Sequence, residues 1–407
     1  MASTAASQPA DQGRYLLAAT TVAGHGLKHL YAAAFMIVLP EIKAGLMLTN
    51  VAAGALVTAR DVSAGVSTMP AGFIADRFSG KWAMILTISM ALLAIGYLAA
   101  GTLERYWAVA ISIVLFGIGV SLWHPSALAS LSARFPTRRG FAISLHGSGG
   151  SAGEILGPLI AGSLLLVIAW PQLLQYSFIP TAVAAVLVWF ALRNLRGQQG
   201  VTSIREYFAT SGVLLKNWVF IAVVVLSGFR SLSNHVISVF VPIYLREDLD
   251  FSSFEVGVYA SMLQAVGIVT HPIMGYVSDK YGRKVALIPG MIFFGLLCIA
   301  LAYAAEGPQL ILTIIAIGAV MFTFHHIFVA YAIDLSPPGV HGTSVALIYT
   351  GSMLFGGVGA ILGGLLADEV SLPSTFIFAG AVVIAAALLL IFVPTRKNPV
   401  PAPATRA

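Results

Sequence analysis

The chain has 407 residues, of which 58% are hydrophobic and only 9% are charged, and its mean hydropathy is +0.91. Soluble globular proteins carry about 25% charged residues, so this composition excludes an ordinary soluble enzyme or binding domain and indicates a polytopic membrane protein. The formal net charge of +6 could suggest nucleic-acid binding, but the positions of the basic residues, given below, indicate a membrane topology instead.

Apolar runs long enough to cross a bilayer recur along nearly the whole chain. A helix of about 20 residues crosses the ~30 Å hydrocarbon core, and short polar turns separate the runs. The sequence therefore predicts an all-α membrane protein. We expect twelve transmembrane helices, at 15–40, 49–74, 82–101, 106–134, 138–169, 173–195, 217–245, 253–277, 284–304, 308–335, 340–368 and 372–394.

The longest connection between predicted helices, RGQQGVTSIREYFATSGVLLKN, divides the chain into two sets of six. This division predicts an N-terminal bundle at 15–197, a cytoplasmic linker at 198–216 and a C-terminal bundle at 217–394. We expect cytoplasmic tails at 1–14 and 395–407.

The basic residues are distributed unevenly between the two sides of the membrane. If both termini lie on one side, 16 of the 22 Lys and Arg residues fall on that side, and only Lys43, Arg105 and Arg246 fall on the other. Loops rich in Lys and Arg stay in the cytoplasm. We therefore expect a multi-pass protein of the inner (cytoplasmic) membrane with both termini in the cytoplasm.

The two halves contain a repeated loop. GFIADRFSGKWAM, from residue 72, aligns with GYVSDKYGRKVAL, from residue 275, at an offset of 203 residues, so that Asp76 aligns with Asp279. Each copy follows the second predicted helix of its half. The agreement indicates an internal duplication.

The pattern G-x-x-x-D-[RK]-x-[GS]-x-K in these loops resembles the signature of the major facilitator superfamily of transporters. The resemblance implies two pseudo-symmetric six-helix bundles, with a substrate site near the membrane midplane between them. It also implies a gating role for charged residues of the two loops, which tie neighbouring helix ends together in one conformational state. These residues are Asp76, Arg77, Lys81, Asp279, Lys280, Arg283 and Lys284.

A second stretch, GIGVSLWHPSALASLSARFPTRRGFAISLHGSGGSAGEILGPLIAG, resembles the fosmidomycin-resistance branch of efflux proteins in its order of G-x-G, His-Pro, Arg-x-Gly, Gly-rich and Gly-Pro elements. His25 and His29 match a further feature of that branch, a His in the first helix followed four residues later by a polar group. Two positions depart from drug/proton antiporters, because Ile113 replaces an arginine and Ser144 a glycine. The direction of transport therefore stays open.

Ionisable residues inside the predicted helices are candidate functional groups, because they are costly at bilayer depth unless they pair or face a cavity. His25, Lys28 and His29 have the spacing of one helix face. Offsets of 202 and 201 residues, close to that of the loops, align Lys28 with Arg230 and His124 with His325. Two such cations facing one cavity would attract an anion. The predicted substrate-binding residues are His25, Lys28, His29, Arg230, Asn234, His124, His325 and Gln264.

The alternative for Lys28 or Arg230 is an internal ion pair with a buried carboxylate. Asp61 and Glu154 are the only carboxylates deep within the predicted helices, and burial favours a neutral carboxyl group. We predict that these two residues, with Arg60, couple transport to protons. Adjacent helical residues point about 100° apart, so we expect Arg60 and Asp61 on different faces. For Glu154, the alternative is a packing role on a glycine-rich helix.

Histidines are numerous inside the predicted helices, and they could relay protons or bind a transition metal. No nearby cysteine, carboxylate cluster or HExxH pattern supports a metal, so the sequence predicts no metal site and no cofactor. The eight histidines are His25, His29, His124, His146, His235, His271, His325 and His326.

These observations predict a secondary active transporter rather than an enzyme. The favoured function is proton-coupled efflux, by alternating access, of a small anionic or zwitterionic compound. The partners expected are this substrate, protons and the lipid bilayer, with the protein acting as a monomer and binding no nucleic acid. The alternatives are proton-coupled uptake of an organic anion, and a histidine-based transition-metal transporter or membrane-embedded sensor.

Overall fold

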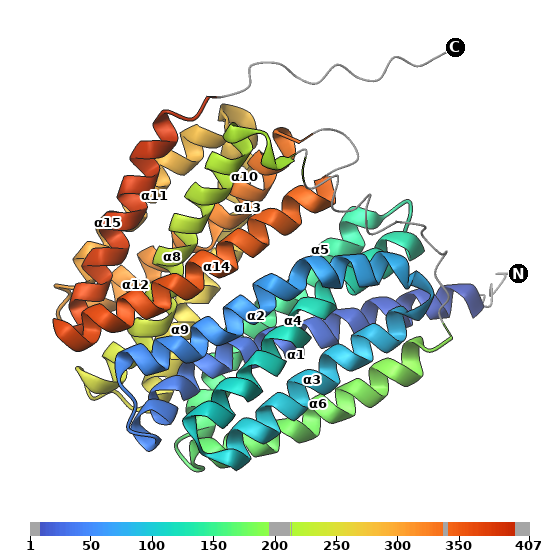
Figure 1. The fold of residues 1–407 in the computed structure, drawn as a ribbon, viewed down its shortest axis with the longest axis horizontal. Helices are drawn as coiled ribbons and strands as arrows, with labels where there is room; N and C mark the ends of the chain where they lie inside the picture. Colours follow the sequence, from blue (N-terminus) through green and yellow to red (C-terminus); the bar gives the residue numbers. More distant parts are fainter. Residues whose placement is uncertain (1–8, 195–211, 213, 337–340, 395–407) are drawn as a thin grey trace, which may run out of the picture.

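The computed structural model of the protein describes residues 9–194, 212, 214–336 and 341–394, without the side chains of residues 9–12, 76 and 79 (Figure 1). Every regular element in these residues is a helix, so the predicted all-α fold is confirmed. The predicted linker lies mostly outside the described residues and the predicted C-terminal tail lies wholly outside them, so the division at 198–216 stays a prediction.

The N-terminal half consists of long helices with short connections. They are α1 (Pro9–Gly45), α2 (Asn50–Arg77), α3 (Trp82–Leu103), α4 (Tyr106–Arg134), α5 (Arg139–Leu164) and α6 (Trp170–Leu192), with a short 3₁₀ turn, η1 (Ser79–Lys81), between α2 and α3. The first helix is longer than predicted at both ends, whereas α5 ends before the predicted residue 169.

The C-terminal half repeats this plan, with two of its six spans broken. It contains α8 (Trp218–Glu247), α9 (Ser253–Ala265), α10 (Gly267–Tyr281), α11 (Arg283–Leu301), α12 (Pro308–Met321), α13 (Thr323–Asp334), α14 (His341–Glu369) and α15 (Leu372–Ile391). The predicted helix 253–277 is the broken pair α9 and α10, and the predicted helix 308–335 is the broken pair α12 and α13. The twelve predicted spans are therefore present.

Local sequence explains where several helices begin. The hydroxyl of Ser252 accepts a hydrogen bond from the backbone N–H of Glu255, whose carboxylate accepts one from the backbone N–H of Ser252, which is a capping box at the start of α9. Asn217 caps α8 in a similar way, through its side-chain oxygen. Gly282, at φ 101°, occupies the left-handed region between α10 and α11, a conformation that favours glycine.

Ten of the described helical spans are long and apolar enough to cross a membrane. The two remaining spans, α2 and α5, are not among these ten, and both lie where the halves meet. The contacts between halves are mainly those of α2 with α14 and of α5 with α9. Each pair joins the second span of one half to the fifth span of the other, as a pseudo-two-fold axis between the halves requires.

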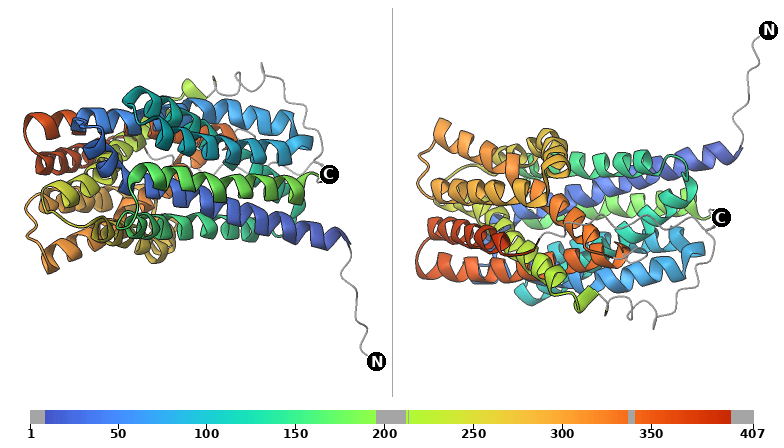
Figure 2. Two further views of the ribbon diagram at one scale, coloured as in Figure 1. Left: turned by 90° about the horizontal axis from the view of Figure 1, so that it is seen from below. Right: turned by 90° about the horizontal axis from the view of Figure 1, so that it is seen from above.

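The two bundles lie side by side and are inclined to one another, with α2 and α14 running along the seam (Figure 1). Figure 2 shows the same bundles turned by 90°, with the helices of each half running alongside each other. Glycines allow close approach at the seam. A Cβ atom at Gly54 of α2 would lie 2.2 Å from the Ala360 carbonyl oxygen of α14, and one at Gly257 of α9 would lie 2.4 Å from the Pro158 carbonyl oxygen of α5.

Two ion pairs join the halves where α1 and α8 end, and we call this the closed end of the molecule. The ammonium nitrogen of Lys43 lies 2.7 Å and 2.5 Å from the two carboxylate oxygens of Glu247. Arg246 Nε donates to the Glu41 carboxylate over 2.8 Å, and the Ser253 hydroxyl donates to the same oxygen over 2.9 Å. These pairs hold the ends of α1, α8 and α9 together.

A third link at the closed end caps a helix of one half with a carboxylate of the other. Asp368, near the end of α14, accepts hydrogen bonds from the backbone N–H groups of Asn50 (2.8 Å) and Val51 (2.9 Å) in the first turn of α2. A negative charge at a helix N-terminus satisfies orphan donors and interacts favourably with the helix dipole. The cap is therefore available only while the two halves stay together at this end.

Candidate functional site

Lys28 and Arg230 are buried at equivalent places in the two halves, with exposed fractions of 1% and 3%. Lys28 Nζ on α1 lies 2.6 Å from His124 Nε2 on α4. Arg230 Nη2 on α8 lies 3.4 Å from His325 Nδ1 on α13. Each half therefore contains a cation beside an imidazole, at positions that the sequence repeat aligns.

Glu154 on α5 lies where the two halves face each other. Its carboxylate is 2.8 Å from His29 Nδ1 on α1, and the side chain keeps 36% of its surface exposed. It also interacts electrostatically with Lys28 in its own half and with His271 and His326 in the other. Glu154 therefore forms the polar link between the N-terminal cation and the histidines of the C-terminal half.

Four imidazole rings form a cluster inside the N-terminal half. The ring of His25 stacks on that of His146 at a centroid distance of 3.9 Å, and its centroid lies 4.5 Å from that of His29 and 4.9 Å from that of His124. The nearest ring nitrogen of His25 lies 2.7 Å from the His146 carbonyl oxygen, and that of His146 lies 3.1 Å from the Thr21 carbonyl oxygen. We call His25, His29, His124 and His146 the histidine cluster.

The C-terminal half has a looser counterpart. The ring centroid of His326 lies 5.3 Å from that of His271 and 5.8 Å from that of His325. His325 also packs edge-on against Tyr349 of α14, at 4.5 Å, so Tyr349 lies beside the histidine that contacts Arg230. Tyr349 was not predicted as a site residue, because an isolated tyrosine in an apolar helix carries no distinctive sequence signal.

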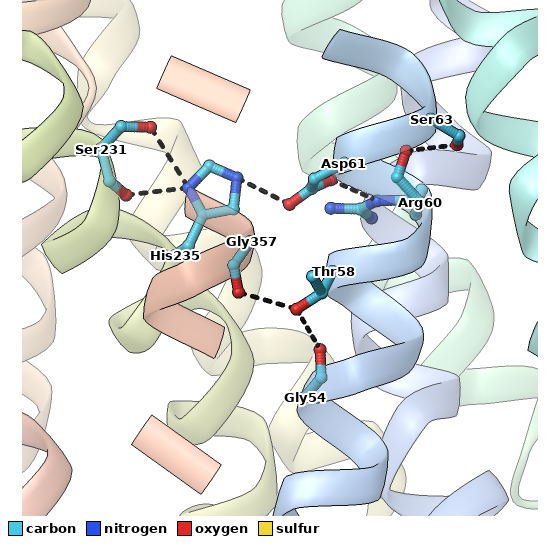
Figure 3. Close-up of polar contacts among 8 residues, drawn as sticks. All are labelled: Gly54, Thr58, Arg60, Asp61, Ser63, Ser231, His235 and Gly357. Atoms are coloured by element: carbon cyan, nitrogen blue, oxygen red, sulfur yellow. Dashed lines mark hydrogen bonds and ion pairs between the residues drawn. The ribbon is translucent and has the colours of Figure 1, made fainter. Parts of the chain in front are cut away.

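Asp61 on α2 joins the two halves through a histidine (Figure 3). One carboxylate oxygen lies 2.9 Å from Arg60 Nε, and the other lies 2.9 Å from His235 Nε2 on α8. The other ring nitrogen of His235 is 2.8 Å from the Ser231 carbonyl oxygen. The side chain of Asp61 is only 3% exposed, so this is a buried network that crosses the seam.

Arg60 and Asp61, which we expected on different faces of the helix, are in contact through their side chains. Their Cβ atoms diverge, but the long arginine side chain turns back along the helix and reaches the neighbouring carboxylate (Figure 3). One turn away, the Thr58 hydroxyl hydrogen-bonds to the Gly357 carbonyl oxygen of α14 over 2.7 Å. Asp61 is therefore paired with Arg60 and His235, not with Lys28 or Arg230.

Asn234 and Gln264 occupy less central positions than the histidines. Asn234 donates a hydrogen bond from Nδ2 to the Met321 carbonyl oxygen over 3.0 Å, where α12 gives way to α13. This bond gives a partner to a carbonyl oxygen at the helix break, where backbone groups can lose their helical partners. Gln264 is half-buried near the end of α9 and, in the part of the chain that the structure describes, makes no hydrogen bond to the other site residues.

The predicted gating residues of the second half tie helix ends together within that half. Arg283 pairs with Asp279 of α10, and its Nε lies 2.8 Å from Asp334 at the end of α13. Lys284 Nζ donates to the Ile391 carbonyl oxygen at the end of α15 over 2.9 Å. Lys280 lies over the ring of Tyr281, 5.1 Å from its centroid.

In the first half, Arg77 and Lys81 both lie over the ring of Phe78, at 5.9 Å and 5.7 Å from its centroid. The side chain of Asp76 lies outside the described part. This end of the molecule, where α6 ends and α8 begins, is called the linker end. The hydrogen bonds and ion pairs that the described residues make with one another across the seam lie at the closed end or near the middle, not at the linker end.

Comparison with known proteins fits this architecture. A model of the Major Facilitator Superfamily matches residues 22–270 and 223–407. The chain belongs to this superfamily. It is 23% identical over 390 residues to the fosmidomycin resistance protein of Escherichia coli, covering 92% of this chain and 91% of that protein. The predicted resemblance to the fosmidomycin-resistance branch of this superfamily is thereby confirmed.

Other members of the superfamily are also similar. The cis,cis-muconate transport protein of Acinetobacter baylyi is 21% identical over 358 residues, which cover 84% of this chain and 85% of that protein. The crystal structure of the nucleoside transporter NupG shares the fold, with a TM-score of 0.77, 16% identity and coverage of 93% of this chain and 98% of that one. The protein is therefore a multi-pass membrane transporter of the major facilitator superfamily, not an enzyme.

Proposed function

We propose that the protein is a proton-coupled exporter of a small anionic or zwitterionic compound, acting as a monomer in the inner membrane with its linker end in the cytoplasm. The observation that carries this proposal is the pair of buried cations, Lys28 and Arg230, at equivalent positions in the two halves. A substrate bound between the halves would be held by one cation from each, as alternating access between two bundles requires.

The surroundings of Arg230 favour an anion. A guanidinium group has five N–H donors, yet its only hydrogen bond in the described structure is the 3.4 Å contact with His325, and Nε is buried without a partner. No carboxylate among the described residues pairs with it. The free donors suit the bidentate recognition of a carboxylate or phosphate. The named substrate of one relative, cis,cis-muconate, is a carboxylate, which supports this choice.

Asp61 is proposed as the proton-coupling carboxylate. Where the closed end is sealed, its carboxylate is paired with Arg60 and with His235. Opening the closed end would separate α2 from α8 and α14 and break the contact with His235, so that a proton can take its place. Protons would then bind on the outer side and leave on the cytoplasmic side. Glu154, half-exposed and paired with His29, is the second proposed proton carrier.

Antiport requires that the proton and the substrate compete for one group. A zwitterionic substrate whose cationic group pairs with ionised Glu154 would compete with a proton there, whereas a proton on Glu154 would free His29 and Lys28 for a simple anion and so favour uptake together with a proton. The likeness to the fosmidomycin resistance protein supports export. The second candidate function is proton-coupled uptake of an organic anion, which the likeness to the cis,cis-muconate transport protein favours.

Binding of an anion is tested first, by thermal-shift screening of the purified protein against organic phosphates, phosphonates and carboxylates, since a ligand of the folded form raises its apparent stability. Loss of a charge-assisted hydrogen bond in Arg230→Ala should weaken binding about 10- to 100-fold. Arg193→Ala removes an exposed cation at the linker end and should bind normally. Unchanged binding in Arg230→Ala would remove the anion-site assignment.

Coupling and direction are tested in vesicles. Asp61→Asn should abolish accumulation driven by a pH gradient while retaining substrate exchange, because a neutral amide cannot release a proton. Accumulation at the normal level in this variant would exclude Asp61 from coupling. In inverted membrane vesicles, an exporter accumulates substrate when protons are allowed to flow out, whereas a symporter accumulates it in right-side-out vesicles with protons flowing in.

A further inference from the structure

We propose that His25, His124 and His146 form a binding site for one divalent transition-metal ion of the zinc, cobalt and nickel class. The residues come from α1, α4 and α5, and one ring nitrogen of each lies within 4.8 Å of the others. Folding brings together residues that are separated in sequence by up to 121 positions. For this reason no metal-binding pattern is visible along the chain.

The hydrogen bonds of two of these rings fix the tautomer that a metal ligand needs. A carbonyl oxygen can only accept, so His25 Nδ1 must donate to the His146 carbonyl and His146 Nδ1 must donate to the Thr21 carbonyl. Nε2 of each neutral ring then carries a lone pair. Both Nε2 atoms are buried without a hydrogen-bond partner in the described structure.

This arrangement is the one that metal-binding proteins use around a ligating histidine. The ring nitrogen that does not bind the metal donates to a backbone carbonyl or a carboxylate, which holds the ring in position. His29, whose ring lies 4.5 Å from that of His25, shows the same pattern with Glu154, and its Nε2 is also buried without a partner. His29 is therefore placed to support the site or to complete it.

The donor set selects the kind of ion. Three neutral imidazoles and no carboxylate suit zinc, cobalt, nickel or copper, whereas magnesium and calcium prefer oxygen ligands. Such a site leaves a fourth coordination position open. The bound ion would supply a partner for lone pairs that have none in the described structure.

Lys28 is the internal competitor of the metal. Its ammonium group lies 2.6 Å from His124 Nε2, where it holds the lone pair that the ion would use, and its charge opposes that of a cation. Metal binding requires Lys28 to leave His124, which its flexible side chain allows. The geometry therefore makes the site stronger when Lys28 is removed, a result that a purely structural histidine cluster does not give.

The test uses the full chain purified with a tag that contains no histidine, stripped by a chelator and titrated with Co²⁺ alone. We expect binding of one ion, with visible absorption of a nitrogen-coordinated ion that Zn²⁺ displaces. His25→Asn keeps an N–H for the His146 carbonyl and lacks the Nε2 ligand, so Co²⁺ affinity should fall about 100-fold. His146→Asn keeps an N–H for the Thr21 carbonyl and also lacks the Nε2 ligand, so it should weaken Co²⁺ binding by the same factor. His341→Asn changes an exposed histidine outside the site and should bind normally. Lys28→Met should bind more tightly.

Co²⁺ binding that is unchanged in both His25→Asn and His146→Asn would overturn the proposal, as would weaker binding in Lys28→Met. Should the asparagine variants fail to fold, X-ray absorption of the zinc-loaded native protein decides the matter, because three imidazoles must appear around the ion and an oxygen-only shell refutes the site. His146 is not among the proposed substrate ligands, so His146→Asn should lose the metal but keep anion binding. Failure of this proposal and failure of the anion site are thereby distinguishable.

Discussion

Replacing Gly54 with alanine should open the closed end. A Cβ atom there would lie 2.2 Å from the Ala360 carbonyl oxygen and 2.9 Å from its carbon, whereas ordinary contact begins at 3.4 Å. The oxygen contact is therefore 1.2 Å too short, and the obstructing atoms belong to helix backbone that has no rotamer to change. The backbones of α2 and α14 must separate, which a state open at this end permits and the closed state does not.

Overpacking of this kind costs about 1–3 kcal/mol, so the ratio of open to closed molecules should rise about 5- to 150-fold. The assay is the maleimide-labelling rate of Thr58→Cys, whose side chain faces Gly357 across the seam (Figure 3). The native Cys298 is fully buried and contributes little background. In the Thr58→Cys protein, adding Gly54→Ala should raise the labelling rate by the same factor as the ratio of open to closed molecules.

The matched control is Gly147→Ala, where a Cβ atom would meet nothing within 4 Å. The double variant Gly147→Ala with Thr58→Cys should react with maleimide at the same rate as Thr58→Cys alone. An unchanged rate in Gly54→Ala would refute the reasoning, since it would mean that the seam absorbs the methyl group without opening. Labelling of Cys298 itself reports unfolding and must stay low for the comparison to count.

The remaining predictions concern the other links at the closed end. Reversing either charge of the Lys43 and Glu247 pair should increase the labelling rate of Thr58→Cys. The double exchange Lys43→Glu with Glu247→Lys should return the rate to its original value. A rate that stays high in the double exchange would show that the pair does not hold the halves together. Asp368→Asn should weaken the cap on Asn50 and Val51 by about 0.5–2 kcal/mol and speed labelling about 2- to 30-fold. High salt should reduce this effect of Asp368, and an effect independent of salt would point to packing instead of charge.

The internal repeat was the most informative part of the sequence. Offsets of 202 and 201 residues align Lys28 with Arg230 and His124 with His325, and the structure places each cation beside the histidine of its own half. Duplication preserves the geometry inside a six-helix unit, so contacts within one half are predictable from the other. The hydropathy pattern predicts the spans for a separate reason, since each helix must be apolar enough to lie in lipid.

Contacts between the halves could not be predicted. Lys43 and Glu247 stand near helix ends, where charged residues ordinarily face water. Their separation of 204 residues is close to the repeat offset, but equivalence between the halves does not show that two residues meet at the seam. Asp61 and His235 are far apart in sequence and unrelated by the repeat. These pairs depend on how two bundles are docked, and a transporter must dock them in more than one way. One sequence must be compatible with every docked arrangement of the two bundles, so its pattern does not indicate the contacts of any single arrangement.

Helix breaks were missed for a different reason. The predicted span 308–335 contains no proline after Pro308, and its glycine, Gly318, lies a full turn before Phe322, so its local sequence favours a continuous helix. The structure interrupts it there, where Asn234 of another helix hydrogen-bonds to the Met321 carbonyl oxygen. A tertiary contact therefore overrides local propensity, and such a contact is invisible to a pattern read along one segment.

The break between α12 and α13 makes the two halves mechanically unequal. In the described N-terminal half, α4 runs uninterrupted from Tyr106 to Arg134, whereas its counterpart is split beside the histidines that it carries. Asn234 lies one turn after Arg230 on α8, so a ligand that draws Arg230 inward also pulls on the bond that spans the split. If Arg230 binds the substrate as proposed, the first response to binding should be a bend at this split, within the C-terminal bundle.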